Sequence, residues 1–179
     1  MAVVAKKYAQ ALYETSLDKD VLDLMYEEFA AVDEAAVPNQ DKLKAFDSDP
    51  KNIATSRKGL VETSFKGVNQ YLMNMLYVMA ENRHLSILPE VFKAFEGLYN
   101  QYYNQDFATV ESVHELSQEE LDKVGEALIQ RTGLSKLIIT NVINQTLIGG
   151  IRAKVGTKVF DGSIQNDLAQ IERKFIRTK

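Results

Sequence analysis

The amino-acid sequence predicts an α+β protein, in which an N-terminal six-helix bundle is followed by a small C-terminal α/β domain. Through the first hundred residues, apolar side chains recur at spacings of three and four, the period of one helical face. After residue 106, short β-branched runs replace that period, which is typical of strands. We therefore expect two domains, a helical bundle over residues 1–105 and an α/β domain over residues 106–179.

Capping and breaking residues divide the first domain into helices. Asp20 is expected to cap the second helix, and Pro38 to end it, because proline lacks the backbone N–H that a helix interior needs. Asp49 and Pro50 offer an N-cap followed by the residue type favoured at the first helical position. Pro89 can begin the last helix of the bundle. The expected helices cover residues 2–17, 21–37, 42–46, 50–65, 69–82 and 89–102.

The second domain combines strands with one central helix and one terminal helix. Ser117 and Glu120 fit a capping box, in which each residue satisfies a free backbone N–H of the other, and Gly133 ends that helix. Gly156 supplies the turn of a hairpin, and Ser163 is expected to cap a final amphipathic helix. The expected strands cover residues 107–113, 137–144, 147–155 and 158–160.

Composition excludes several classes of protein. The net charge of −4 argues against a general nucleic-acid binder, and the absence of cysteine excludes disulfides and thiolate chemistry. No apolar run approaches the roughly 18–20 residues that span a bilayer, so we expect no direct membrane insertion. The amphipathic start carries Glu14 and is expected to form the first helix, not a signal peptide. We expect a cytosolic protein of bacterial type.

The motifs that could carry catalysis are incomplete. His114 and Glu115 begin a zinc-protease pattern, but Gln118 occupies the position of the second histidine ligand. The order Gly156-Thr157-Lys158 between two strands is reversed relative to a phosphate-binding loop. Without a nucleophile, a base and an orienting partner, we assign no catalytic residue, no metal ligand and no cofactor.

Two apolar stripes on predicted helices are better candidates for function. Side by side they would form a groove for an incoming amphipathic helix, and methionine suits such adaptable surfaces. Ordinary core packing gives the same periodicity, so both interpretations stay open at this point. The stripes consist of Val4, Tyr8, Ala11 and Leu12 on the first helix and Leu72, Met75, Val78 and Met79 on the fifth.

Three stretches resemble one family over almost the whole chain and in the same order. The segment from Tyr8 to Glu14, YAQALYE, resembles the YAxAL opening of the delta subunit of F-type ATP synthases, the family of the mitochondrial oligomycin-sensitivity-conferring protein. Residues 79–91, MAENRHLSILPEV, are similar to its mid-chain segment. Residues 147–168 resemble its carboxy-terminal signature, which here comprises Gly149, Gly150, Asp161, Gly162 and Ser163.

This resemblance implies a non-catalytic stator, or peripheral-stalk, subunit, which couples rotation to proton-driven ATP synthesis. The bundle would bind the N-terminal helix of an alpha subunit between its first and fifth helices, beside the beta subunits of the catalytic head. The C-terminal domain would engage the b subunits of the stalk. The protein would then lie peripherally on the cytoplasmic face of the bacterial plasma membrane.

The chain departs from the family pattern at several surface positions. His84 stands where an arginine is common, and Asn144 where an acidic residue often precedes the two glycines. Two alternatives to the stator also remain: a helical interaction module of another kind with an α/β tail, and an enzyme acting on a small molecule. A deep polar pocket around His84 or His114 would favour the enzyme.

Overall fold

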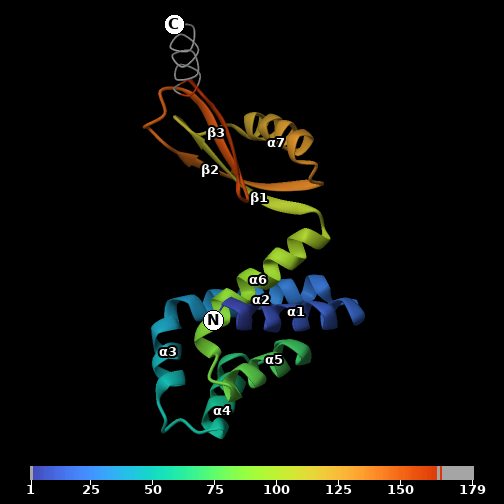
Figure 1. Cartoon of the computed structure of the whole chain (residues 1–179), viewed down its shortest axis with the longest axis vertical. Helices are drawn as coiled ribbons and strands as arrows, with labels where there is room; N and C mark the ends of the chain where they lie inside the picture. Colours follow the sequence, from blue (N-terminus) through green and yellow to red (C-terminus); the bar gives the residue numbers. More distant parts are fainter. Residues whose placement is uncertain (1, 165, 167–179) are drawn as a thin grey trace, which may run out of the picture. The chain divides into compact units, whose positions relative to one another are not determined.

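The chain forms two compact units, Met1–Tyr99 and Asn100–Lys179. The structure, a computed structural model, describes residues 2–164 and 166 (Figure 1). Each unit has a hydrophobic core of its own. The division between the units falls within the last helix of the first unit. It lies six residues before residue 105, where the sequence pattern predicted the end of the first domain. Helices together with a mixed four-stranded sheet confirm the α+β class.

Six α-helices belong to the first unit, the last of them running on into the second. Two short 3-10 turns, η1 (Val37–Asn39) and η2 (Leu85–Ile87), connect neighbouring helices. Among the residues that the structure describes, no helix is both long and apolar enough to cross a membrane. The α-helices are α1 (Ala2–Asp18), α2 (Leu22–Ala36), α3 (Gln40–Ser48), α4 (Ala54–Ser64), α5 (Gln70–Glu81) and α6 (Leu88–Tyr102).

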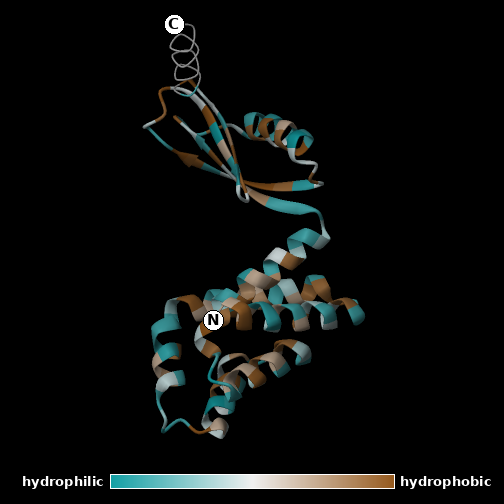
Figure 2. Cartoon of the chain, viewed as in Figure 1, coloured by the Kyte–Doolittle hydropathy of each residue, from teal (hydrophilic) through white to brown (hydrophobic). Residues whose placement is uncertain are grey.

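Aromatic side chains of α2 and α6 form the centre of the bundle core. The fully buried ring of Phe29 lies 5.1 Å from that of Phe92 and 5.7 Å from that of Phe95, between ring centroids. Tyr26 stacks on Tyr99 with centroids 4.1 Å apart. Such pairs contribute beyond the burial of their area. Hydrophobic residues, drawn in brown, recur between hydrophilic ones along the helices of the bundle (Figure 2).

The predicted caps at Asp20 and Asp49 are wrong. Asp20 adopts a left-handed conformation with φ of 55°, and the N-cap of α2 is Val21. Asp49 accepts a hydrogen bond at 2.9 Å from the backbone nitrogen of Lys51, so its side chain closes a local turn and α4 begins only at Ala54. Short aspartate side chains commonly compete with helix initiation in this way.

The described part of the second unit consists of a mixed sheet with one helix on one face. The strands lie in the order β2-β1-β3-β4, with β1 parallel to β2 and the other pairs antiparallel. Helix α7 connects the parallel pair and packs its buried Leu128 against the sheet (Figure 1). The elements are β1 (Gln105–Ser112), α7 (Gln118–Thr132), β2 (Lys136–Ile143), β3 (Gly150–Val155) and β4 (Lys158–Ser163).

The local signals predicted for this unit are largely confirmed. Ser117 and Glu120 form the complete capping box, and Gly133 ends α7 with a left-handed φ of 76°. Val155 pairs with Lys158 across the two-residue turn of the β3–β4 hairpin. The strand predicted from residue 147 begins later, at Gly150. The final helix predicted after Ser163 lies almost wholly outside the described residues.

Candidate partner-binding groove

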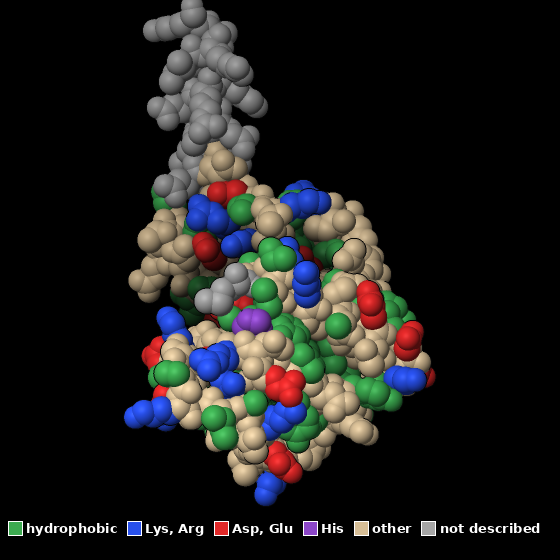
Figure 3. Space-filling view, turned by 60° about the horizontal axis from the view of Figure 1, so that its bottom comes forward, with side chains coloured by type: hydrophobic (Ala, Val, Ile, Leu, Met, Phe, Trp, Pro, Cys, Tyr) green, Lys and Arg blue, Asp and Glu red, His purple; other side chains and the backbone are tan. Residues whose placement is uncertain are grey.

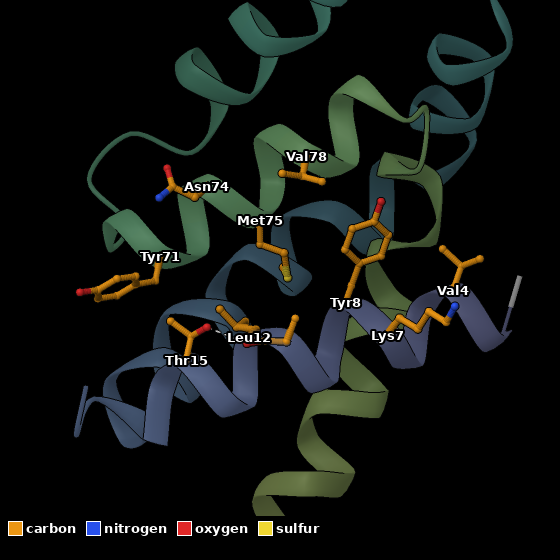
Figure 4. A pocket seen from close by; sticks show the side chains of 10 residues that line it. Val4, Lys7, Tyr8, Leu12, Thr15, Tyr71, Asn74, Met75 and Val78 are labelled. Carbon is orange, nitrogen blue, oxygen red and sulfur yellow. Dashed lines mark hydrogen bonds between the residues drawn. The ribbon is translucent and has the colours of Figure 1, made fainter. Parts of the chain in front are cut away.

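A groove with a volume of about 570 Å³ lies between α1 and α5. Most of its lining is apolar or aromatic, and the labelled side chains in Figure 4 come from both helices. Hydrophobic side chains gather on the surface of the bundle, with charged ones scattered around them (Figure 3). The groove is lined by Val4, Lys7, Tyr8, Ala11, Leu12, Thr15, Tyr71, Asn74, Met75 and Val78.

Helix α1 carries two adjacent apolar faces with different roles. Ala5 and Ala9 are fully buried against the bundle core, where their small side chains let α1 approach its neighbours closely. Val4 and Tyr8, one position earlier in each case, turn towards the groove and remain half-buried. Leu12 belongs to both faces, since it is buried and also lines the groove.

Helix α5 shows the same division, and here the sequence prediction needs a correction. Met75 and Val78 line the groove, and Val78 is 45% exposed. Leu72 and Met79 are fully buried in the core and do not line it. At 100° per residue, Met79 and Leu72 lie about 100° and 120° around the helix from Val78, on the side that faces the core. The lining includes Tyr71 instead, which the apolar pattern did not select.

The rim of the groove contains a hydrogen bond that the sequence did not indicate. The hydroxyl oxygen of Tyr8 lies 3.1 Å from Nδ1 of His84, and the two rings meet edge to face. Burial raises the pKa of the Tyr8 phenol, and a hydrogen bond with the Asn82 side chain partly offsets that effect. His84, which was expected at a surface position, thus contacts a side chain of the groove.

The residues of the carboxy-terminal signature lie together at the open end of the β3–β4 hairpin. Asp161 accepts hydrogen bonds from the backbone nitrogen of Ser163 at 3.0 Å and from its hydroxyl at 2.6 Å. These bonds, with a further one from Arg152 at 3.1 Å, lower the pKa of the Asp161 carboxyl. The network fixes the end of β4, which is a structural task.

Gly149 and Gly150 precede this network and differ in what they require. Gly150 has a φ of 80°, and a Cβ atom there would lie 2.3 Å from the carbonyl oxygen of Gly162. At Gly149 a Cβ atom would meet only the terminal methyl of Ile164. The close approach of another backbone therefore explains Gly150, the second glycine of the pair. Glycines in strands often mark such sites.

The described residues contain no group of three or more histidine and carboxylate side chains that could hold a metal ion. His114 lies in the second unit, where its backbone oxygen accepts a hydrogen bond from the Ser112 hydroxyl at 2.6 Å. A polar pocket of the bundle includes His84 with Lys44, Asp47 and Glu90. Asp47 has a structural contact there, since its Oδ2 accepts a hydrogen bond from the backbone nitrogen of Ser86 at 2.8 Å.

Comparison with known proteins gives consistent matches. Residues 4–175 match the model of the family described as ATP synthase delta (OSCP) subunit. Proteins named ATP synthase subunit delta are 90% identical in Staphylococcus carnosus (strain TM300) and 54% identical in Staphylococcus saprophyticus, each over 100% of both chains. A chain in the cryo-EM structure of the Toxoplasma gondii mitochondrial ATP synthase hexamer has the same fold, with a TM-score of 0.69 at 17% identity, covering 96% of this chain and 97% of that one.

Proposed function

The chain belongs to the ATP synthase delta (OSCP) subunit family, and on this premise we propose that it acts as a non-catalytic stator subunit. Its task is then to hold the catalytic head to the peripheral stalk, so that the head does not turn with the rotor. The observation that carries this proposal is the apolar groove between α1 and α5. The subunit would lie peripherally, on the cytoplasmic face of the plasma membrane, as part of a complex that makes ATP with a proton gradient.

The groove has the dimensions of a helix-binding site. Its lining on α1 runs from Val4 to Thr15, which corresponds to roughly 17 Å, or three turns, at 1.5 Å per residue. Three turns present apolar anchors at the i, i+3, i+4 and i+7 positions by which an amphipathic helix enters such a groove. We propose that the N-terminal helix of an alpha subunit is this occupant, which places the beta subunits of the head beside it.

The exposed valine on α5 supports the same role. Val78 leaves 45% of its surface in contact with solvent, although Leu72 and Met79 on the same helix are fully buried. Covering an apolar surface that is already held rigidly releases water without a large loss of conformational entropy. Slow dissociation of the kind that resists torque requires such preorganised anchors, and it requires no titratable machinery.

We assign the second attachment, to the C-terminal ends of the b subunits, to the C-terminal unit. One face of its sheet packs against α7, whereas several β-branched residues elsewhere on β2 and β4 remain exposed. Val142 and Val159 are 43% and 57% exposed, respectively. Exposed apolar side chains on a sheet of this size are available to a partner, which would stabilise a small domain that buries little surface by itself.

The test is titration of the full-length chain with a labelled peptide that copies the N-terminal helix of the alpha subunit. We expect Tyr8→Ala and Val78→Asp each to weaken binding by about 10-fold or more, as loss of a buried anchor does. Val37→Asp is the matched control, because Val37 is also exposed, at 53%, but lies on η1 away from the groove. Wild-type affinity in a correctly folded Tyr8→Ala, Val78→Asp double variant would overturn the groove assignment.

The wider proposal is tested by capture from bacterial membranes with the tagged full-length chain. A stator subunit should retain the alpha, beta and b subunits together. Recovery of none of these, from membranes in which the complex is intact, would contradict the stator function itself.

A further inference from the structure

The groove contains a single charged side chain among its ten lining residues. This side chain is Lys7 of α1, and the amine lies beside Val4 at one end of the groove (Figure 4). The opposite end is polar without charge, where Thr15, Tyr71 and Asn74 lie. The groove is therefore electrically asymmetric along its length.

Lys7 has no acidic partner among the described residues. The positions one helical turn away on α1 are Val3, Val4, Gln10 and Ala11, none of which carries a charge. On α5 the acidic residue closest in sequence to the groove lining is Glu81, and its carboxylate pairs with Lys58 at 2.5 Å. The Lys7 side chain is exposed, so water surrounds its ammonium group in the free chain.

A bound helix would remove part of that water. An apolar side chain laid over the Lys7 amine would leave the charge desolvated and unpaired, which is unfavourable. A carboxylate on the bound helix at this position would replace the lost water with a charge-assisted hydrogen bond. The groove therefore discriminates between helices that are equally apolar but differ in charge at one edge.

We propose that Lys7 is a specificity-determining residue that selects an amphipathic helix carrying an aspartate or glutamate at the edge of its apolar face. The carboxylate lies at the Val4 end of the groove, so the pair also fixes the register and the direction of the bound helix. This inference rests on the proposed function, because it concerns the occupant of the same groove. It adds the chemical character of that occupant and the residue that recognises it.

The experiment measures the affinity of the full-length chain for the alpha N-terminal peptide and for variants in which each acidic residue is replaced in turn by lysine. We expect one replacement to weaken binding to the wild-type chain by about 10-fold, the scale of a misplaced charge at an interface. With the Lys7→Glu chain the order should reverse, so that this lysine-substituted peptide binds more tightly than the unmodified peptide. Lys6→Glu is the control, since Lys6 is the exposed neighbour with the same charge and does not line the groove.

The outcomes separate this inference from the function on which it rests. If the unmodified peptide does not bind the wild-type chain, the groove assignment fails. If it binds but Lys6→Glu and Lys7→Glu respond alike to every peptide, only general electrostatic attraction is at work and Lys7 is not a selector. The proposal also fails if every acidic residue of the peptide can be replaced without a change in affinity for the wild-type chain. This result does not require any variant of the chain to fold.

Discussion

The phenol oxygen of Tyr8 on α1 lies 3.1 Å from Nδ1 of His84, which follows α5 in the chain. The backbone nitrogen of His84 in turn donates to the carbonyl oxygen of Met79 at 2.9 Å, so the histidine is fixed to the end of α5. One wall of the groove is thereby tied to the other by a side-chain bond. The orientation of the Tyr8 ring depends on this bond as well as on the packing of α1.

We expect His84→Ala to weaken binding of the alpha peptide by about 3- to 10-fold, because loss of one hydrogen bond at the rim releases the Tyr8 ring. Tyr8→Phe, which removes only the hydroxyl, should give a similar loss. The double variant should be no weaker than either single one, since both remove the same bond. Isothermal titration measures all three, and His114→Ala serves as the control. Additive losses would show that the bond does not position the ring.

The division of α5 into two faces gives a second prediction. Met79→Ala should lower the free energy of unfolding by about 2–4 kcal/mol, as truncation of a buried methionine does, and leave the affinity of the folded chain for the peptide unchanged. Val78→Ala should change stability by less than about 1 kcal/mol and weaken the peptide complex. Urea denaturation and titration together distinguish the two effects. Equal effects of both variants on affinity would mean that the two faces are not separate.

The contrast between Val78 and Met79 shows what periodicity can and cannot establish. Spacing identified α1 and α5 as helices with broad apolar surfaces, and it selected six of the ten groove residues: Val4, Tyr8, Ala11, Leu12, Met75 and Val78. It could not tell the core side of α5 from the groove side, because both are apolar and α5 is nearly apolar all round. That choice depends on how α1 packs against α5, which is a tertiary property.

The two missed caps and the missed histidine contact have different physical origins, one local and one long-range. Asp49 was expected to begin a helix, yet its carboxylate bonds the nearby Lys51 nitrogen, and the two local arrangements are close in energy. His84 contacts Tyr8 across 76 residues of sequence, and no local pattern signals such a pair. By contrast, the capping box of Ser117 and Glu120 is wholly local, and the sequence predicts it in full.

The two glycines before β3 should differ in their tolerance of alanine. Gly150→Ala places a Cβ atom against the backbone of Gly162 at a φ of 80°, so we expect it to destabilise the C-terminal unit by roughly 1–3 kcal/mol. Gly149→Ala meets only the movable methyl of Ile164 and should have a much smaller effect. Hydrogen exchange of the β3 and β4 amides reports on this unit separately. Equal hydrogen-exchange protection in the two variants would contradict the different roles given to Gly149 and Gly150.

Tyr26 should make the bundle sensitive to alkaline pH. Burial, aided by the nearby charge of Glu96 and a hydrogen bond to it, raises the pKa of the Tyr26 phenol to about 12 from 10.0. The unfolded chain therefore releases this proton at lower pH than the folded chain does. The contribution of the protonated phenol to the stability of the fold is complete below pH 10 and is lost as the pH rises towards 12. Tyr26→Phe should reduce the fall in melting temperature over this range, with Tyr102→Phe, an exposed phenol, as the control. An unchanged fall would be inconsistent with this prediction.

Asp33 of α2 gives the opposite kind of prediction, a substitution that stabilises. One of its carboxylate oxygens, Oδ1, is buried without a hydrogen-bond partner among the described residues. Burial, with a further effect from the negative charge of Glu90, raises the pKa of the Asp33 carboxyl above 3.8. The folded state therefore holds this proton more tightly than the unfolded state does. That preference stabilises the fold below pH 3.8 and is lost as the pH rises through the raised pKa.

At pH 7 the charged carboxylate thus opposes folding, and Asp33→Asn should raise the free energy of unfolding. The gain should be roughly a few tenths of a kcal/mol, since Asp33 is only half-buried and solvent screens its charge. It should disappear near pH 3, where the wild-type carboxyl is protonated as well. Glu34→Gln, at the exposed neighbouring position, provides the matched control in urea denaturation at both pH values. A gain of the same size at pH 3 and pH 7 would show that the removed charge is not its cause.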